Sequence, residues 1–417
     1  MSHAITPASS LETTPRGEVT AAEWERVRRI GLLVAAGGAT AFVVLGLIHW
    51  LLHRDQGLHA AKQLFVSYLV GYNYWLGSAL GGLVFLMLQY VTGGAWGLFL
   101  RRILEASASM ILPLAVLFIP MIFGLPIVYE EYGRWTPVLS DDANLQFKAM
   151  WLSAPAVTIK TILYFACWIG MASLFRRWSR QQDQGADGTL LERCETLGAP
   201  GIVVYALTIT FASIDWVMSL EPDWYSTIFP AMFAVGQLLN GYAFALTVFL
   251  FLSDRPPFAG AVRPAHMRDF GSLLLAFVMF WAYMSFSQFL LIWVGNLPEE
   301  TPWYLMRSRG GWQFVVSFIA LFHFAVPFML LLFRDIKDHR RRLLAVAAGL
   351  MIMRFIDLFW WIEPSLNHYG QYFYWLLDIA AWTAVGGLCV WWFAGQLNSR
   401  PLLPWNDPYL AEVLHHE

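Results

Sequence analysis

Charged side chains are scarce in this sequence. Asp, Glu, Lys and Arg make up only 13% of the 417 residues, whereas hydrophobic residues make up 58%. A soluble protein of this size needs far more charge to cover its surface. The formal net charge is only −2, and no basic stretch interleaved with aromatic residues occurs. The composition therefore excludes an ordinary soluble protein and argues against nucleic acid as a partner.

Cysteine and cofactor motifs are also missing. The three cysteines, Cys167, Cys194 and Cys389, are scattered, and no C-x-x-C or C-x-x-C-H occurs, so iron–sulfur ligation and attached haem are not supported. A P-loop and a G-x-G-x-x-G motif are absent. A b-type haem needs facing histidines, and only His49 and His323 fall within apolar segments, far apart in the chain. The sequence therefore predicts no metal or cofactor bound by this chain itself.

Hydrophobic runs about 20 residues long recur along the whole chain, and this is the length that a bilayer core requires of a helix. We expect membrane-spanning helices at about 31–52, 64–89, 108–129, 154–175, 200–220, 225–252, 271–294, 312–333, 343–362 and 373–395. The amphipathic segment 93–106 either extends the third helix or lies at the membrane interface. The sequence thus predicts an all-α polytopic membrane protein with about ten transmembrane helices.

The distribution of Lys and Arg predicts the orientation. Residues 1–29 are polar and lack the apolar core of a signal peptide, so we expect an uncleaved tail. This tail, the C-terminus and the alternate loops on their side carry 19 Lys and Arg, whereas the loops on the other side carry 6. Because basic residues concentrate in cytoplasmic loops, both termini are expected in the cytoplasm.

A short pattern occurs twice in the sequence. The first motif, residues 214–222, reads IDWVMSLEP, and the second motif, residues 356–364, reads IDLFWWIEP. Four predicted helices separate them, as expected of two parallel four-helix bundles, helices 2–5 and 6–9, with helices 1 and 10 peripheral. The predicted division is an N-terminal tail at 1–29, peripheral helix 1 at 30–63, bundles at 64–224 and 225–364, peripheral helix 10 at 365–399 and a C-terminal tail at 400–417.

Ionisable side chains inside membrane spans are costly, at about 2.5 kcal/mol or more, and usually face a bundle interior. The candidates, which we predict to form a proton path, are Lys160, Asp215, Glu221, His323, Arg354, Asp357, Glu363 and Asp378. In each motif the Asp and the Glu are six residues apart, about 9 Å along a helix, and form a ladder toward the outer face. Arg354 and Asp357 are expected to pair. Alternatively, these groups only hold helices together or cap the Glu-Pro turns.

One string is specific enough to suggest a family. Residues 213–229, S-I-D-W-V-M-S-L-E-P-D-W-Y-S-T-I-F, in a chain with ten predicted spans, resemble the NrfD-like, polysulfide-reductase-type membrane subunits of quinol-linked complexes. They are most similar to the F subunits of alternative complex III. The resemblance implies a fold of two four-helix bundles with two peripheral helices. It also implies a subunit of a bacterial inner-membrane oxidoreductase that passes electrons from menaquinol to cytochrome c or a copper protein.

The resemblance further implies partners and cofactors. Besides lipid, these are a sister quinol-binding membrane subunit, an iron–sulfur subunit and c-type haem subunits, so menaquinone, the iron–sulfur clusters and haem c lie outside this chain. The sister subunit uses a His and an Asp on bundle helices, whereas here the third helix has no His and the fourth offers Lys160. This departure favours a non-catalytic subunit that supports menaquinol oxidation and conducts protons. The alternatives are a quinol-binding subunit that uses Lys160 and Asp215, and a stand-alone ion transporter.

Overall fold

The computed structural model describes residues 17–93, 95–128, 143–185, 188–366, 375–407 and 409–410. Across these ranges the chain is built of helices, and no β-strand occurs in them. Nine of the described helices are long and apolar enough to cross a membrane, and a bent pair of shorter helices supplies a tenth span. The protein is therefore a polytopic α-helical membrane protein, and the predicted fold class is confirmed.

The first unit of four spans is formed by residues 58–216. It comprises α2 (Leu58–Thr92), a broken span made of α3 (Arg101–Ala108), α4 (Ile111–Leu117) and α5 (Ile119–Val128), then α8 (Ala154–Gln184) and α9 (Gly188–Trp216). The short helix α7 (Ala143–Trp151) precedes α8, and a 3₁₀ turn, η3 (Met218–Leu220), follows α9. The two parts of the broken span meet at 53°.

The second unit repeats this order. It comprises α10 (Phe229–Leu252), α11 (Pro264–Gly295), a span made of α13 (Trp312–Ile319), the π-helical turn η4 (Ala320–Ala325) and α14 (Val326–Leu332), and finally α16 (Arg340–Ile362). The short helices α12 (Thr301–Arg307) and α15 (Arg334–Asp338) connect the spans, and the 3₁₀ turn η5 (Glu363–Ser365) follows α16. The second motif thus ends its unit as the first motif ends the other.

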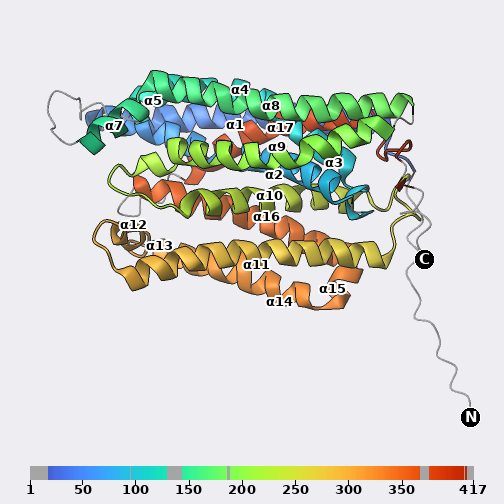
Figure 1. Ribbon diagram of the computed structural model, residues 1–417. Helices are drawn as coiled ribbons and strands as arrows, with labels where there is room; N and C mark the ends of the chain where they lie inside the picture. The colour runs from blue at the N-terminus through green and yellow to red at the C-terminus, as the bar shows by residue number, and fades with distance from the viewer. Residues whose placement is uncertain are drawn as a thin grey trace, which may run out of the picture.

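Two helices lie outside the units and pair with each other. The helices α1 (Ala21–Leu52) and α17 (Trp375–Asn398) run side by side (Figure 1), and α17 also packs against α2. Glycines allow α1 and α17 to approach closely, because a Cβ on Gly38 would lie 2.5 Å from the backbone of Ala384, and one on Gly387 would lie 2.3 Å from Ala35. Lipid supplies no hydrophobic driving force between helices, so close van der Waals packing at these small residues stabilises the contact of α1 with α17.

The two units meet through their first helices. The helices α2 and α10 are the most deeply buried spans, with 83% and 78% of their apolar windows enclosed by other helices. Their backbones touch at Gly81 and Gly241, where a Cβ on Gly81 would lie 2.3 Å from the carbonyl oxygen of Gln237. Any larger side chain there would separate the units, so this contact fixes how the bundles sit against each other.

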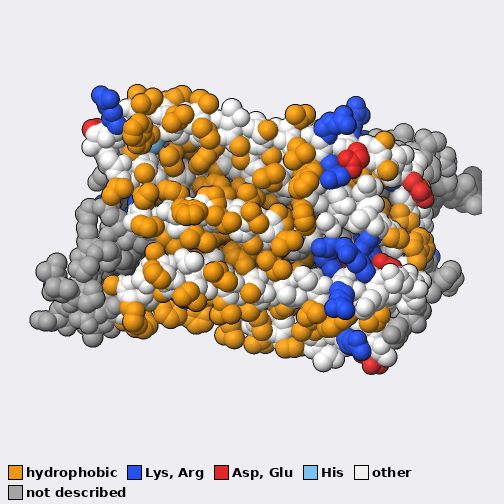
Figure 2. Space-filling view, turned by 90° about the horizontal axis from the view of Figure 1, so that it is seen from above, with side chains coloured by type: hydrophobic (Ala, Val, Ile, Leu, Met, Phe, Trp, Pro, Cys, Tyr) orange, Lys and Arg blue, Asp and Glu red, His pale blue; other side chains and the backbone are white. Residues whose placement is uncertain are grey.

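The molecule has two distinct ends. We call the end that holds α3, α15, the end of α8 and the start of α9 the basic end, and the end that holds α7, α12, η3 and η5 the far end; they lie to the right and left in Figure 1. Figure 2 shows a broad band of hydrophobic side chains, with Lys and Arg gathered toward the basic end. Such a band between polar ends is the surface expected of a protein that spans a bilayer.

Several helices exceed their predicted bounds. The helix α1 starts at Ala21, where Thr20 and Glu23 form a capping box, so part of the predicted tail 1–29 is helical. The third span begins at Arg101 rather than at residue 108, so residues 101–106 of the segment 93–106 extend the third helix, and all of α3 is buried. The first 16 residues, and 411–417 of the predicted C-terminal tail, lie outside the described residues.

Candidate functional site

The deepest carboxylate of the first unit is Asp215, the Asp of the first motif. It is fully buried, and its Oδ1 lies 2.6 Å from Nζ of Lys160 on α8. Trp151 Nε1 donates to the same oxygen at 2.9 Å, and the Tyr164 hydroxyl donates to Oδ2 at 2.8 Å. The carboxylate thus accepts hydrogen bonds from a cation and from two neutral groups, as a buried polar group requires.

Lys160 reaches Asp215 from the surface of the bundle. Its ammonium lies 3.8 Å from the centre of the Trp151 ring and donates to the Trp151 carbonyl oxygen at 3.1 Å. Its side chain is 17% exposed, and its helix neighbours Ile159 and Leu163 are 67% and 59% exposed. The pair of Lys160 and Asp215 thus lies at the lipid-facing edge of the first unit and not at its centre.

The second motif has a different arrangement around Asp357. Its carboxylate pairs with Arg354 on the same helix, which confirms the predicted pair, and accepts a hydrogen bond from Trp281 Nε1 at 3.2 Å. Arg354 and Asp357 are 2% and 1% exposed, so the pair is buried inside the second unit. Gly236 makes room for Arg354, because a Cβ there would lie 2.3 Å from the guanidinium carbon.

His323 lies in the same region of the second unit. Its ring is fully buried, 4.2 Å from the centre of the Trp281 ring, and neither ring nitrogen has a hydrogen-bond partner among the described residues. It occupies the π-helical turn η4, and such turns are frequent at functional sites. His323, Trp281, Asp357 and Arg354 therefore form one cluster, which brings together three of the predicted residues.

The Glu of the first motif contacts the other unit. Oε1 of Glu221 lies 3.5 Å from Nη1 of Arg307, the last residue of α12. Arg307 is 1% exposed and also donates to the Trp361 carbonyl oxygen at 2.8 Å and to Ser365 Oγ at 3.1 Å. Burial lowers the pKa of Arg307 to about 10 while Glu221 opposes the change, so the guanidinium stays charged at neutral pH.

The Glu of the second motif contacts the first unit in return. Both carboxylate oxygens of Glu363 accept from Nε2 of Gln63 on α2 at 3.0 Å, and Ser67 Oγ donates to Oε1 at 3.3 Å. Asp378 of α17 faces Glu363 and Ser67 and is fully buried. Two buried carboxyl groups therefore meet where α2, α16 and α17 converge.

The two carboxylates of each motif bind different partners, and the ladder between them stays a prediction. In the first motif α9 ends at Trp216, directly after Asp215, and η3 continues the same apolar span as far as Leu220, next to Glu221. In the second motif α16 continues to Ile362, yet Asp357 and Glu363 still bind separate partners. The assumption of one continuous α-helix does not hold in the first motif, because the five residues between Asp215 and Glu221 include the end of α9 and the turn η3. Across the described residues, the ionisable groups instead form separate sites in the far half of the molecule.

Several partners in these sites lie outside the set that the sequence predicts. Arg307 falls in the loop between two predicted spans, and Gln63, Trp281 and Tyr164 are not among the predicted site residues. The signal for Arg307 is the helix TPWYLMR between two spans, which buries the Arg against Trp303 at 3.8 Å. The other partners come from helices distant in sequence, so no local pattern points to them.

No group of three or more His, Cys, Asp and Glu side chains is placed to hold a metal ion in the part of the chain that the structure describes. The fold and the buried ionisable groups define the class: a polytopic α-helical membrane protein with polar sites inside its helix bundles. Comparison with family models found no match, and comparison with curated proteins found no similar sequence. The specific function therefore rests on the residues and their geometry.

Proposed function

We propose that this chain is an integral membrane subunit of a quinol:electron-acceptor oxidoreductase of the alternative complex III type. It supports menaquinol oxidation and contributes a path for protons, while iron–sulfur and haem groups reside in partner subunits. The string at 213–229 and the two-unit architecture support this proposal. The basic end then faces the cytoplasm of a bacterial inner membrane, with both termini on that side.

The observation that carries the proton role is the number of buried carboxyl groups in the far half. Asp215, Asp357, Glu363 and Asp378 are each at most 1% exposed. Removing a carboxylate from water costs several kcal/mol, so burial of four of them is not explained by packing alone. Each accepts hydrogen bonds or faces another ionisable group, so it lies within a polar site from which a proton path could be built.

The sites around Glu221 and Glu363 are joined through one turn, η5. Arg307, which pairs with Glu221, also binds Ser365 in η5, and the same turn begins with Glu363. Glu363 in turn leads to Asp378. A change of charge at one glutamate is therefore felt at the other through Arg307 and η5. This linkage suits a subunit in which redox events in a partner change proton affinity.

Purification tests the complex directly. The chain, tagged and isolated under mild conditions from its own membrane, should bring with it subunits whose absorption spectra show c-type haem and iron–sulfur clusters. The isolated complex should oxidise menaquinol with cytochrome c as acceptor. Recovery of the chain alone, with ion transport by the single chain in vesicles, would contradict the proposal and favour a stand-alone transporter.

One observation favours a second candidate, a quinol-binding site at Lys160 and Asp215. This pair lies at the lipid-facing edge of α8, beside the flat ring of Trp151, where a quinone arrives from the bilayer. The ammonium and the carboxylate would hold the two polar edges of the head group, and the quinone would supply the redox chemistry. Lys160→Met should then give resistance to a quinone-site inhibitor, whereas Lys148→Met, which changes a nearby lysine on α7, should not.

A further inference from the structure

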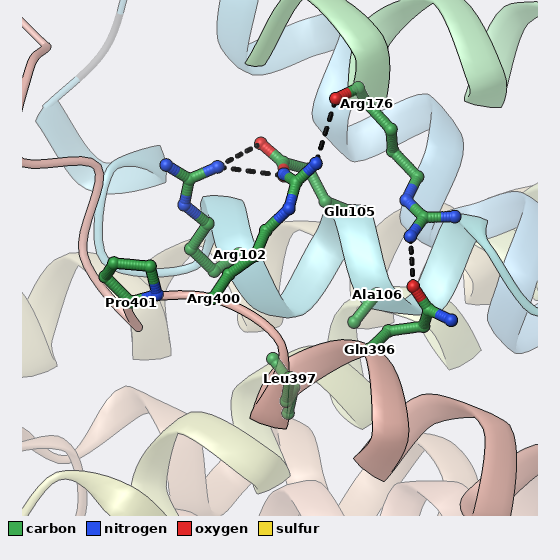
Figure 3. Close-up of a pocket in the computed structure, with 8 residues that line it drawn as sticks. All are labelled: Arg102, Glu105, Ala106, Arg176, Gln396, Leu397, Arg400 and Pro401. Carbon is green, nitrogen blue, oxygen red and sulfur yellow. Dashed lines mark hydrogen bonds and ion pairs between the residues drawn. The ribbon is translucent and has the colours of Figure 1, made fainter. Parts of the chain in front are cut away.

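A pocket lies at the basic end, opposite the sites described above. Its lining consists of Arg102, Glu105, Ala106, Arg176, Gln396, Leu397, Arg400 and Pro401. Figure 3 shows that these side chains come from α3, from the end of α8 and from the end of α17 with the segment that follows it. Three guanidinium groups and a single carboxylate share the lining, so positive charge is in excess.

Carboxylates of this region form ion pairs with two of the three arginines, Arg102 and Arg400. Glu105 is 2% exposed, and its Oε2 lies 3.1 Å from Nη1 of Arg102 and 2.8 Å from Nη1 of Arg400. Asp183 pairs with the other terminal nitrogen of Arg102. Ser179 Oγ donates to Glu105 Oε1 at 2.7 Å, which fixes the carboxylate in place. Both oxygens of Glu105 are therefore already engaged by Arg102, Arg400 and Ser179.

Arg176 is the arginine without a carboxylate. Its guanidinium donates to Oε1 of Gln396, a neutral amide, and no Asp or Glu in the described ranges pairs with it. Positive charge is crowded around it: burial lowers the pKa of the neighbouring Arg400, and the charges of Arg102 and Arg180 lower that pKa further while Glu105 opposes the change. Arg176, which has no carboxylate partner, would therefore be stabilised by an anion that the chain itself does not provide.

The position of the pocket limits the source of that anion. Leu174, two residues before Arg176, is 39% exposed and belongs to the apolar surface, whereas Arg177 and Arg180 are exposed and charged. Arg176 therefore lies where the exposed apolar side chains of α8 give way to exposed arginines. Figure 2 shows the same kind of border, a hydrophobic band followed by Lys and Arg toward the basic end, which is the depth of lipid head groups. We propose that the pocket binds the phosphate of an anionic phospholipid, with Arg176 as the principal ligand.

A lipid titration of the purified full-length chain tests this assignment. We would measure the melting temperature in detergent as phosphatidylglycerol is added, for the wild type, Arg176→Gln and Arg177→Gln. Arg177 is the matched control, because it is an exposed neighbour of the same charge outside the pocket. Phosphatidylglycerol should raise the melting temperature of the wild type and of R177Q alike, whereas R176Q should need roughly tenfold more lipid for half the effect.

Other variants and ligands make the outcome decisive. Arg176→Lys keeps the charge and loses the planar fork, so it should weaken the lipid response only severalfold, and it serves where R176Q does not fold. Phosphatidylcholine and inorganic phosphate should leave the melting temperature unchanged. Equal titrations of R176Q and R177Q would overturn the proposal. So would a response to inorganic phosphate that depends on Arg176, because it would assign the pocket to a soluble anion.

Discussion

The two motifs share a sequence skeleton but hold their aspartates in opposite ways. Asp215 is paired with Lys160 from another helix, at the lipid-facing edge, with the cation 17% exposed. Asp357 is paired with Arg354 from its own helix, inside the bundle, with the cation 2% exposed. The first pair therefore joins two helices at the surface, whereas the second is sealed in the core. Equal spacing in sequence does not imply equal exposure of the charge.

The glutamates of the two motifs, in contrast, act alike. Glu221 of the first unit contacts Arg307 of the second, and Glu363 of the second unit contacts Gln63 of the first. Each unit thus closes with a side chain that reaches into the other. The two aspartates differ because each interacts with residues of its own unit. The two glutamates behave alike because each lies at the interface between the units.

The largest effect is expected at the sealed pair. Asp357→Asn leaves Arg354 buried without a carboxylate and should cost about 3–5 kcal/mol of stability. Asp215→Asn should cost less, about 1–3 kcal/mol, because Lys160 keeps its bond to the Trp151 carbonyl oxygen and is partly exposed. Thermal denaturation of the purified protein measures both. Equal losses in the two variants would contradict the contrast between edge and core.

A second comparison concerns the contact between units. Arg307→Gln removes a buried cation that holds Glu221, the Trp361 carbonyl oxygen and Ser365, and should cost about 2–3 kcal/mol. Glu221→Gln should cost about 1 kcal/mol or less, since Glu221 is 14% exposed and Arg307 keeps its other partners. The melting temperatures of the two variants test which substitution costs more stability. A larger loss in E221Q than in the Arg307 variant would contradict the role given to Arg307.

Space for Arg354 can be tested without altering any charge. Gly236→Ala places a methyl group 2.3 Å from the guanidinium carbon and should cost about 1–3 kcal/mol by displacing the arginine. The control is Gly349→Ala on α16, where nothing lies within 4 Å of the added methyl group, and which should be neutral or slightly stabilising. If both variants melt at the wild-type temperature, Arg354 does not need the gap at Gly236.

Modest and equal effects are expected at the two tryptophans. Trp281→Phe and Trp151→Phe each remove one N–H donor to an aspartate, at 3.2 Å and 2.9 Å, and each should cost about 1–1.5 kcal/mol. Here the two motifs should behave alike, because the donor is the same. Denaturation of the two variants side by side provides the test, and a loss confined to one would show that only that donor matters.

The sequence predicted the helices well because each span carries its own hydrophobic signal. The repeat at 214–222 and 356–364 also located the ends of both units, and the spacing of Arg354 and Asp357 predicted a real pair. The end of α9 at Trp216 was not predicted, because no glycine or proline within the motif marks it before Pro222. A local sequence pattern predicts only the side-chain pairs that lie on one helix.

Contacts between helices were beyond the reach of the pattern. Gln63 and Glu363 are 300 residues apart, and Lys160 and Asp215 are 55 apart. Lys160, Asp215 and Glu363 are ionisable residues in or next to apolar spans, which marked them as costly but did not identify their partners. The arginine pocket at the basic end could not be predicted for another reason. Arg102, Arg176 and Arg400 lie outside the predicted spans, as ordinary loop charges do, and only the packing of α3, α8 and the segment after α17 brings them together.

The central claim is that buried carboxyl groups of the far half carry protons while partner subunits carry electrons. It is tested most directly by the number of protons moved per electron in vesicles that contain the reconstituted complex, for the wild type, Asp215→Asn and Glu363→Gln. Both substitutions keep the side-chain shape, so complexes with unchanged haem content are comparable. The account predicts a lower ratio in at least one variant with electron transfer retained. A wild-type ratio in both variants would contradict it.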